Sequence, residues 1–241
     1  MSQSLNGRIV LVTGANGGLG EPLVRQALER GAAKVYAAAR RPKEWGDPRI
    51  EPLRLDITDL DQVARAAETA SDVDLVVNNA AIAPAGDRIT GPEDELRRIF
   101  ETNVFGNLRV ANAFAPVLAA NGGGTLLNVL SAAAWIPVPT GYAMSKAAMW
   151  SATNALRLEL RGQGTDVIGL LVGMIDTPMS AEWEVPKVSP RSVVDQAYDG
   201  VAEGAFEVLA DDDTRGLKSG LGTPAEQLYP PLHEQLEWFT A

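Results

Sequence analysis

Short runs of apolar residues recur along the chain at intervals that suit strands separated by helices. Six of them contain few polar positions and do not alternate cleanly between apolar and polar residues: 8–13, 34–39, 52–55, 74–79, 125–131 and 166–172. Continuous apolar runs of this length are typical of strands buried on both faces of a sheet. A seventh run, 206–210, is a further candidate strand.

Longer stretches with helical spacing lie between these runs. They cover 19–30, 60–70, 93–120, 142–161 and a region near 190–204. Such alternation of strands and helices predicts a parallel sheet with helices on both faces. We therefore expect a single α/β domain over residues 1–241, built on a doubly wound parallel sheet of about seven strands.

Two segments depart from this alternation. The connection RRPKEWGDPRI, at 40–50, is short for a full crossover helix, so we expect only a turn there. The tail at 211–241 begins with three aspartates and continues with several glycines and prolines. We expect a helix that packs on its own domain, while a flap over a pocket and a subunit contact remain open alternatives.

Composition and charge narrow the classes of function. The net charge of −10 argues against binding to nucleic acid or to an anionic membrane. The chain has no cysteine, which excludes disulfides and thiol nucleophiles, and its single histidine argues against a zinc site or a Ser-His-Asp triad. No metal site is expected. Without a signal-peptide pattern or an apolar run of about 18 residues, we expect a cytoplasmic location.

The first candidate strand leads directly into a glycine-rich stretch, TGANGGLG at 13–20, and then into a helix. Glycines allow a tight turn and close approach of the backbone to a ligand, and the following helix presents unpaired N–H groups to a pyrophosphate. This order is typical of the nucleotide-binding end of a Rossmann fold. Gly14 and Gly20 fit two spacings, one completed by Gly18 and the other by Gly17, and the loop alone does not choose between them.

The end of the second candidate strand indicates which nucleotide is preferred. Folds that prefer NAD usually carry an acid here, whereas this chain has Ala39 followed by Arg40 and Arg41. A guanidinium can pair with the extra phosphate of NADP, so we predict NADP(H) rather than NAD(H), with Arg40 as the ligand. The alternative is that both arginines are solvated surface residues.

A third feature at this end of the predicted sheet is the stretch LDIT at 55–58. Asp56 could cap the next helix or bind the adenine amino group, and Thr58 is a second candidate cap.

The stretch GYAMSK at 141–146 carries the candidate chemistry. Tyr142 and Lys146 are four residues apart, so they share one face of a helix. An ammonium group nearby lowers the pKa of a tyrosine, which could then exchange a proton with a carbonyl or an alcohol. Ser131 ends the fifth candidate strand, where its hydroxyl could hydrogen-bond the substrate oxygen.

Together these motifs resemble the classical short-chain dehydrogenase/reductase family over residues 7 to 210. The matching stretches are TGANGGLG, LDIT, NNAA (78–81), ETNVFGN with Asn103, Ser131, YAMSK and GMIDTP (173–178). The resemblance implies Ser131, Tyr142 and Lys146 as catalytic residues and Asn103 as part of a proton relay. It implies a cofactor site formed by Gly14, Asn16, Gly17, Gly18, Leu19, Gly20, Arg40, Asp56, Ile57, Asn79, Ala80, Tyr142, Lys146, Ile175 and Thr177.

The chain departs from the family pattern at two places. Ala81 replaces the usual glycine of NNAG, and Val172-Gly173 replaces the usual Pro-Gly after the sixth strand. We expect the first change to tighten the cofactor wall and the second to make the following loop less rigid.

The expected activity is that of an NADP(H)-dependent carbonyl reductase or alcohol dehydrogenase. An apolar substrate pocket is predicted from Trp135, Ile136, Pro137, Val138, Met174, Met179 and Trp183, although these could equally be core residues. Lys187 is the one cation considered for a substrate carboxylate. A non-catalytic NADP(H) sensor or scaffold is the main alternative. An extended-type epimerase or dehydratase is less consistent, since it needs a larger substrate domain. The resemblance also implies a homotetramer or homodimer, with the 93–120 and 142–161 helices as interface elements.

Overall fold

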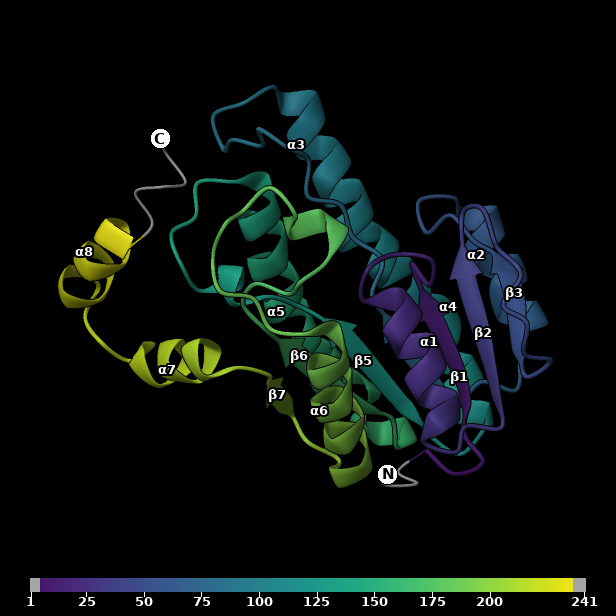
Figure 1. Ribbon diagram of the computed structural model, residues 1–241. Coiled ribbons are helices and arrows are strands. Elements are labelled where there is room, and N and C mark those ends of the chain that lie inside the picture. Colours follow the sequence, from purple (N-terminus) through teal and green to yellow (C-terminus); the bar gives the residue numbers. More distant parts are fainter. Residues whose placement is uncertain (1–4, 236–241) are drawn as a thin grey trace.

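Seven parallel strands form the centre of the computed structural model, which describes residues 5–235. Their order across the sheet is β3-β2-β1-β4-β5-β6-β7, so the order reverses between β1 and β4 (Figure 1). The strands are β1 (Ile9–Thr13), β2 (Lys34–Ala39), β3 (Ile50–Arg54), β4 (Leu75–Asn78), β5 (Thr125–Val129), β6 (Asp166–Leu171) and β7 (Glu207–Leu209). This arrangement is the doubly wound Rossmann fold that the apolar runs predicted.

Helices cover both faces of this sheet (Figure 1). On one face, α1 (Gly20–Glu29) and α6 (Pro190–Glu203) share a buried cluster with Val10 and Val12 of β1. On the other face, α2 (Leu60–Thr69), α4 (Asn107–Ala120) and α5 (Gly141–Glu159) pack with Leu11. Successive residues of β1 therefore point into different cores, which explains why the strand is apolar from Ile9 to Val12.

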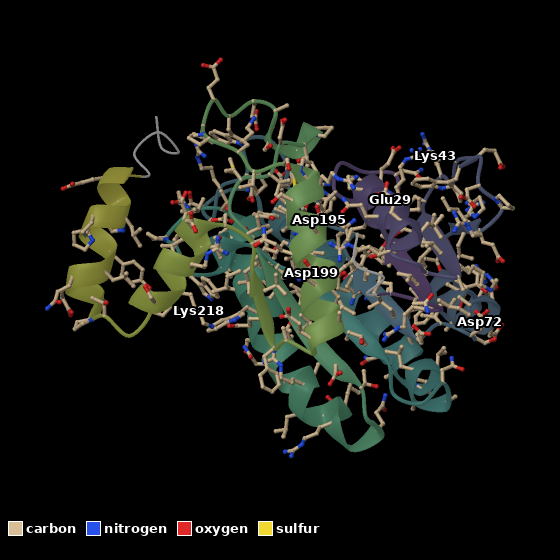
Figure 2. All side chains as sticks on the ribbon, turned by 60° about the horizontal axis from the view of Figure 1, so that its bottom comes forward. Glu29, Lys43, Asp72, Asp195, Asp199 and Lys218 are labelled. Atoms are coloured by element: carbon tan, nitrogen blue, oxygen red, sulfur yellow. The ribbon has the colours of Figure 1, made fainter. Side chains whose placement is uncertain are left out.

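A buried arginine ties α1 to α6. Arg30, at the end of α1, pairs with Asp195 at 2.9 Å and with Asp199 at 2.5 Å, and both carboxylates project from α6 (Figure 2). The buried phenol of Tyr198 donates to the backbone oxygen of Leu23 at 2.7 Å. These polar contacts, with an ion pair between Glu29 and Arg191 at 2.9 Å, fix the relative position of the two helices.

The long helix expected at 93–120 is interrupted. It consists of α3 (Glu93–Phe100), a π-helical turn (Glu101–Gly106) and α4. A β-carbon on Gly106 would lie 2.8 Å from the Ile57 side chain, so the turn packs directly against the segment after β3. The sequence prediction of one continuous helix was wrong here because the interruption depends on this tertiary contact.

The connection between β2 and β3 contains no helix, as its length predicted. Trp45 from this segment is buried in the α1 face of the core. Lys43, labelled in Figure 2, lies with its ammonium 4.4 Å from the centre of the Trp45 ring and pairs with Glu21 of α1 at 2.7 Å. Burial of one indole thus anchors a segment that has no regular structure.

The C-terminal segment forms two helices, α7 (Asp212–Gly220) and α8 (Ala225–Gln235). The prediction of a helix packed on its own domain is met by α7, since Lys218 lies 5.0 Å from the ring centre of Trp135 and pairs with Glu207 (Figure 2). In Figure 1, α8 lies beyond α7 and away from the sheet. Residues 1–4 and 236–241 of the expected 1–241 domain lie outside the described residues.

None of the helices between residues 5 and 235 combines the length and the apolar character that crossing a membrane requires.

Candidate active site

A cavity of about 1580 Å³ opens at the carboxyl ends of the strands. Its walls come from the loops after β1 to β6 and from α3, the π-helical turn, α5 and α7. It contains almost every residue predicted from the sequence: Gly14, Asn16, Gly17, Gly18, Leu19, Arg40, Asp56, Ile57, Asn79, Ala80, Ser131, Tyr142, Lys146, Ile175 and Thr177. Gly20 and Asn103 are not among the lining residues.

The glycine loop between β1 and α1 forms a cradle whose space a side chain would fill. Gly14 has a φ of +65°, and a β-carbon there would lie 3.0 Å from the backbone of Ala80. A β-carbon on Gly18 would lie 2.5 Å from Thr177, and one on Gly20 would lie 2.2 Å from the Gly14 oxygen. Gly17 would meet only that oxygen, at 3.5 Å. The fold therefore requires the Gly14-Gly18-Gly20 spacing, and the cradle at the start of α1 fits a pyrophosphate.

Thr13 links this cradle to the segment after β4, although the sequence did not single out its side chain. Its hydroxyl oxygen accepts hydrogen bonds from the backbone N–H groups of Asn79 at 3.0 Å and Ala80 at 3.1 Å. The Asn79 amide returns a bond to the Thr13 carbonyl oxygen at 2.9 Å. The threonine that precedes the first glycine was the available sequence signal.

Three arginines without an ion-pair partner in the described part of the chain line the part of the cavity that follows β2 and β3. Arg40 and Arg41 are exposed, and together with Arg54 they line the same region as Ala39. Among residues 5–235, none of these three guanidinium groups forms an ion pair. Asn16 of the glycine loop donates to the Arg41 carbonyl oxygen at 2.7 Å, which holds the arginine segment beside the cradle. This end of the cavity therefore favours an additional anionic group.

Asp56 lines the cavity but does not cap α2. Its carboxylate accepts bonds from the backbone N–H of Thr58 at 3.0 Å and from the Thr58 hydroxyl at 2.8 Å. The cap of α2 is Asp59, which accepts from the backbone N–H of Gln62 at 3.0 Å. The prediction that Asp56 or Thr58 caps α2 was wrong, because the N-cap is Asp59, one residue after Thr58 and three after Asp56. Several possible acceptors precede this helix, and the sequence alone did not separate them.

Tyr142 and Lys146 extend from the first two turns of α5 toward Ser131 at the end of β5. Lys146 is 4% exposed, and its ammonium donates to the Val129 carbonyl oxygen at 2.8 Å. That ammonium lies 5.5 Å from the centre of the Tyr142 ring. The Ser131 hydroxyl oxygen accepts from the backbone N–H of Ala133 at 3.1 Å, and the hydroxyl donates to the Val172 carbonyl oxygen across a long 3.5 Å.

Burial is the main influence of the protein on the pKa values of Tyr142 and Lys146. Burial raises the pKa of the Tyr142 phenol, and the Ser131 side chain lowers it in part. Burial also lowers the pKa of the Lys146 ammonium to about 8. The expected lowering of the tyrosine pKa is therefore outweighed by loss of solvation within the protein itself.

Asn103 lies beneath the cavity wall and is only 1% exposed. Its amide oxygen accepts from the Ile82 backbone N–H at 2.8 Å, and its amide nitrogen donates to the Ile82 oxygen at 2.9 Å. The same nitrogen donates to the Ser145 hydroxyl at 3.0 Å, and that hydroxyl donates to the Tyr142 carbonyl oxygen at 2.7 Å. The side chain thus connects the segment after β4 to the backbone of the tyrosine.

Beyond the predicted cofactor residues, both apolar and charged side chains line the cavity. Ile136, Val138, Met174, Met179 and Trp183 line it as predicted. Trp135 and Pro137 do not line it; Trp135 is 6% exposed and belongs to the core beneath α7. Lys187 is also absent from the lining. The sequence reading missed Arg88, Arg98, Glu101, Glu182, Asp213 and Leu217, which come from loops and helices without a recognisable motif.

The turn after β6 is held by a carboxylate from the C-terminal segment. Asp211 accepts from the Gly173 backbone N–H at 2.7 Å, from the Thr214 backbone N–H at 2.7 Å and from the Thr214 hydroxyl at 2.8 Å. It therefore caps α7 and fixes the turn in which proline is missing. This contact offsets the loss of rigidity that we expected for the turn without proline. Ala81, the other departure from the family pattern, lines the cavity.

Comparisons with known proteins agree with this geometry. The family model for short chain dehydrogenases matches residues 8–187. A 1-deoxy-11-beta-hydroxypentalenate dehydrogenase from Streptomyces exfoliatus is 31% identical, over 88% of this chain and 86% of that protein. A short chain dehydrogenase from Burkholderia cenocepacia J2315, solved in complex with NADP, is 37% identical with a TM-score of 0.87, over 98% of this chain and 99% of that chain.

A more distant structure has a different nucleotide. The 3-oxoacyl-[acyl-carrier protein] reductase from Brucella melitensis with bound NAD is 26% identical with a TM-score of 0.76, and the match covers 87% of this chain and 92% of that chain. The matched family model, these relatives and the fold give one conclusion. This chain belongs to the classical short-chain dehydrogenase/reductase family, whose members are oxidoreductases that use a nicotinamide cofactor.

Proposed function

We propose that the protein interconverts a ketone or aldehyde and the matching alcohol, with NADP(H) as cofactor. The observation that carries this proposal is that Tyr142, Lys146 and Ser131 line one cavity with the glycine cradle and the unpaired arginines. A phenol with a neighbouring ammonium is suited to transfer a proton, and the cradle is suited to hold a dinucleotide.

Each group has a distinct task in the proposed reaction. A nicotinamide held in this cavity would supply the hydride in reduction and accept it in oxidation. Tyr142 donates a proton to the substrate carbonyl oxygen as its carbon is reduced, and it removes the alcohol proton in the reverse direction. The Ser131 hydroxyl hydrogen-bonds the same oxygen. The Lys146 ammonium stabilises the phenolate that results, and a cationic ring nearby would add to this stabilisation.

The preference for NADP(H) rests on the region after β2. Ala39 provides no carboxylate to repel a 2′-phosphate, and the exposed guanidinium of Arg40 is available to bind one. The Burkholderia relative, which has NADP bound, supports this choice. Asn79, Ala80, Ile175 and Thr177 would hold the rest of the cofactor, together with Asp56 and Ile57 at its adenine end.

The substrate is proposed to be largely apolar because the inner wall consists of Ile136, Val138, Met174 and Trp183. The proposed assembly is a homodimer or homotetramer. Exposed apolar side chains on the expected interface elements, Phe105 in the π-helical turn and Leu158 in α5, support self-association.

The test is NADPH and NADH consumption with neutral alkyl and aryl ketones and with charged keto acids. Tyr142→Phe should lower kcat about 100-fold or more because it removes the transferred proton. Cofactor binding without turnover of any carbonyl would instead support a non-catalytic sensor. Faster reduction of keto acids than of neutral ketones would contradict the apolar substrate.

The same assay tests the cofactor preference. Arg40→Asp should raise the KM for NADPH about tenfold or more and leave the KM for NADH nearly unchanged. Arg161→Asp makes the same charge change at an exposed arginine outside the cavity and serves as the control. Equal effects of Arg40→Asp on both cofactors would rule out a phosphate contact.

A further inference from the structure

Asp87 lies in the segment between β4 and α3 and is 5% exposed. One carboxylate oxygen accepts from the backbone N–H of Gly141 at 3.0 Å, and the other accepts from the backbone N–H of Tyr142 at 2.8 Å. Across residues 5–235, this carboxylate forms no ion pair. Both oxygens of a buried aspartate thus accept hydrogen bonds from the first two residues of the helix that carries the proposed proton donor.

The first turn of α5 needs such a partner. The initial N–H groups of a helix have no acceptor within the helix, so an uncapped first turn frays. The hydroxyl oxygen of Thr140, the N-cap, accepts from the Ala143 N–H at 3.1 Å, and the Thr140 carbonyl oxygen accepts from the Met144 N–H at 3.2 Å. The N–H groups of Gly141 and Tyr142 are therefore held by Asp87, which is more than fifty residues away in the chain.

Gly141 allows the carboxylate to approach this closely. A β-carbon on Gly141 would lie 3.1 Å from the Asp87 oxygen, 2.6 Å from the Leu96 side chain and 3.1 Å from the Ile99 side chain. The glycine that begins GYAMSK is thus explained by contact with α3 and Asp87.

The same segment holds the other side of the Tyr142 peptide. The Ile82 backbone N–H donates a hydrogen bond to the Asn103 side chain, and the Asn103 amide donates one to the Ser145 hydroxyl. The Ser145 hydroxyl in turn donates to the Tyr142 carbonyl oxygen. Residues 82–87 therefore fix the tyrosine backbone at its N–H through Asp87 and at its carbonyl through Asn103 and Ser145. Lys146 lies one turn further along and is held separately by Val129.

We propose that Asp87 is a positioning residue that holds Tyr142 at the place from which its phenol reaches the substrate oxygen. This inference rests on the proposed function, because it assigns Tyr142 the proton transfer. Asp87 also lines the cavity, but both of its carboxylate oxygens are engaged by backbone N–H groups, so its proposed action on Tyr142 is through the backbone. A displacement of about 1 Å at the reacting group can lower the rate about 100-fold, so loss of this contact should act on kcat.

The test compares Asp87→Ala and Asp87→Asn with Asp59→Ala, which removes the acidic cap of α2 and leaves α5 intact. Asp87→Ala should lower kcat about tenfold or more while the Kd for NADPH, followed by fluorescence, changes less than about twofold. Asp87→Asn keeps one acceptor and should give an intermediate kcat. Asp59→Ala should lower the thermal stability and leave kcat unchanged.

Hydrogen exchange gives a readout that does not need activity. The Gly141 and Tyr142 amides should exchange about tenfold faster in Asp87→Ala, and at the wild-type rate in Asp59→Ala. A wild-type kcat in Asp87→Ala would overturn the inference, as would equal loss of kcat in Asp59→Ala. A wild-type protein that reduces no carbonyl, with exchange still dependent on Asp87, would refute the proposed function and leave Asp87 as a structural cap only.

Discussion

Gly17 and Gly18 stand next to each other in the chain, yet only Gly18 lacks room for a side chain. Its β-carbon would be 2.5 Å from Thr177, whereas that of Gly17 would make one ordinary contact at 3.5 Å. The sequence showed two overlapping glycine patterns and could not separate them, because the distinction depends on a residue that follows β6.

We therefore expect the two glycines to respond differently to alanine. Gly18→Ala should lower the free energy of unfolding by about 1–3 kcal/mol, because Thr177 and Pro178 would have to move. Gly17→Ala should change it by less than about 1 kcal/mol. Urea denaturation without cofactor measures both values, and an equal loss in the two variants would contradict this assignment.

Residue-level prediction succeeded where a residue belongs to a motif with a fixed place on the fold. The strand end at Ser131 and the helical spacing of Tyr142 and Lys146 brought these residues to one cavity. Trp135 does not line the cavity because it is buried in a cluster with Met149 and Leu171, which come from distant parts of the chain. Asp87 was not predicted for a similar reason, since its contact joins the irregular segment after β4 to the start of α5.

At the level of elements, the sequence predicted the seven strands mainly because central strands such as β1 and β4 are buried on both faces and read as apolar runs. The edge strand β3 has exposed residues at Glu51, Pro52 and Arg54, so its apolar run was shorter. The sequence did not predict the π-helical turn at Glu101–Gly106, whose residues are compatible with an ordinary helix. It also did not predict that α7 forms part of the cavity wall through Asp213 and Leu217. Both features follow from packing between elements that are distant in the chain.

The capping contact of α7 leads to a prediction for this element. Asp211→Ala removes three hydrogen bonds and frees both the helix and the turn at Gly173, so the KM for the carbonyl substrate should rise about fivefold or more. The adjacent Asp212 has a side chain that is 98% exposed, so Asp212→Ala is the matched control. Steady-state kinetics at saturating NADPH measures the effect. An unchanged KM in Asp211→Ala would show that α7 does not shape the substrate site.

At the level of the whole molecule, the buried ammonium of Lys146 links folding to pH. Its pKa is about 8 in the folded protein, below the ordinary lysine value of 10.5. Between these values the unfolded chain binds more protons at this site than the folded chain does. The free energy of unfolding therefore increases as the pH rises above 8, because the buried Lys146 loses its proton more easily than an unfolded lysine does. Below pH 8 the buried ammonium destabilises the folded protein to its full extent.

This linkage can be measured by comparing the wild type with Lys146→Met. Between pH 8 and pH 9.5, the wild type should gain about 2 kcal/mol of stability relative to the variant. Urea denaturation at several pH values in this range gives the difference, in which the titration of other groups cancels. Parallel pH profiles for the two proteins would mean that the Lys146 pKa is not lowered by burial.

The contact between Gly18 and Thr177 also bears on how the chain is made. The glycine loop is among the first parts to be synthesised, but the wall against which Gly18 rests comes from beyond β6. A nascent chain that ends before Thr177 has only half of the nucleotide cradle. We therefore expect cofactor to stabilise the complete cradle only after Thr177, in the last third of the 241-residue chain, has been synthesised.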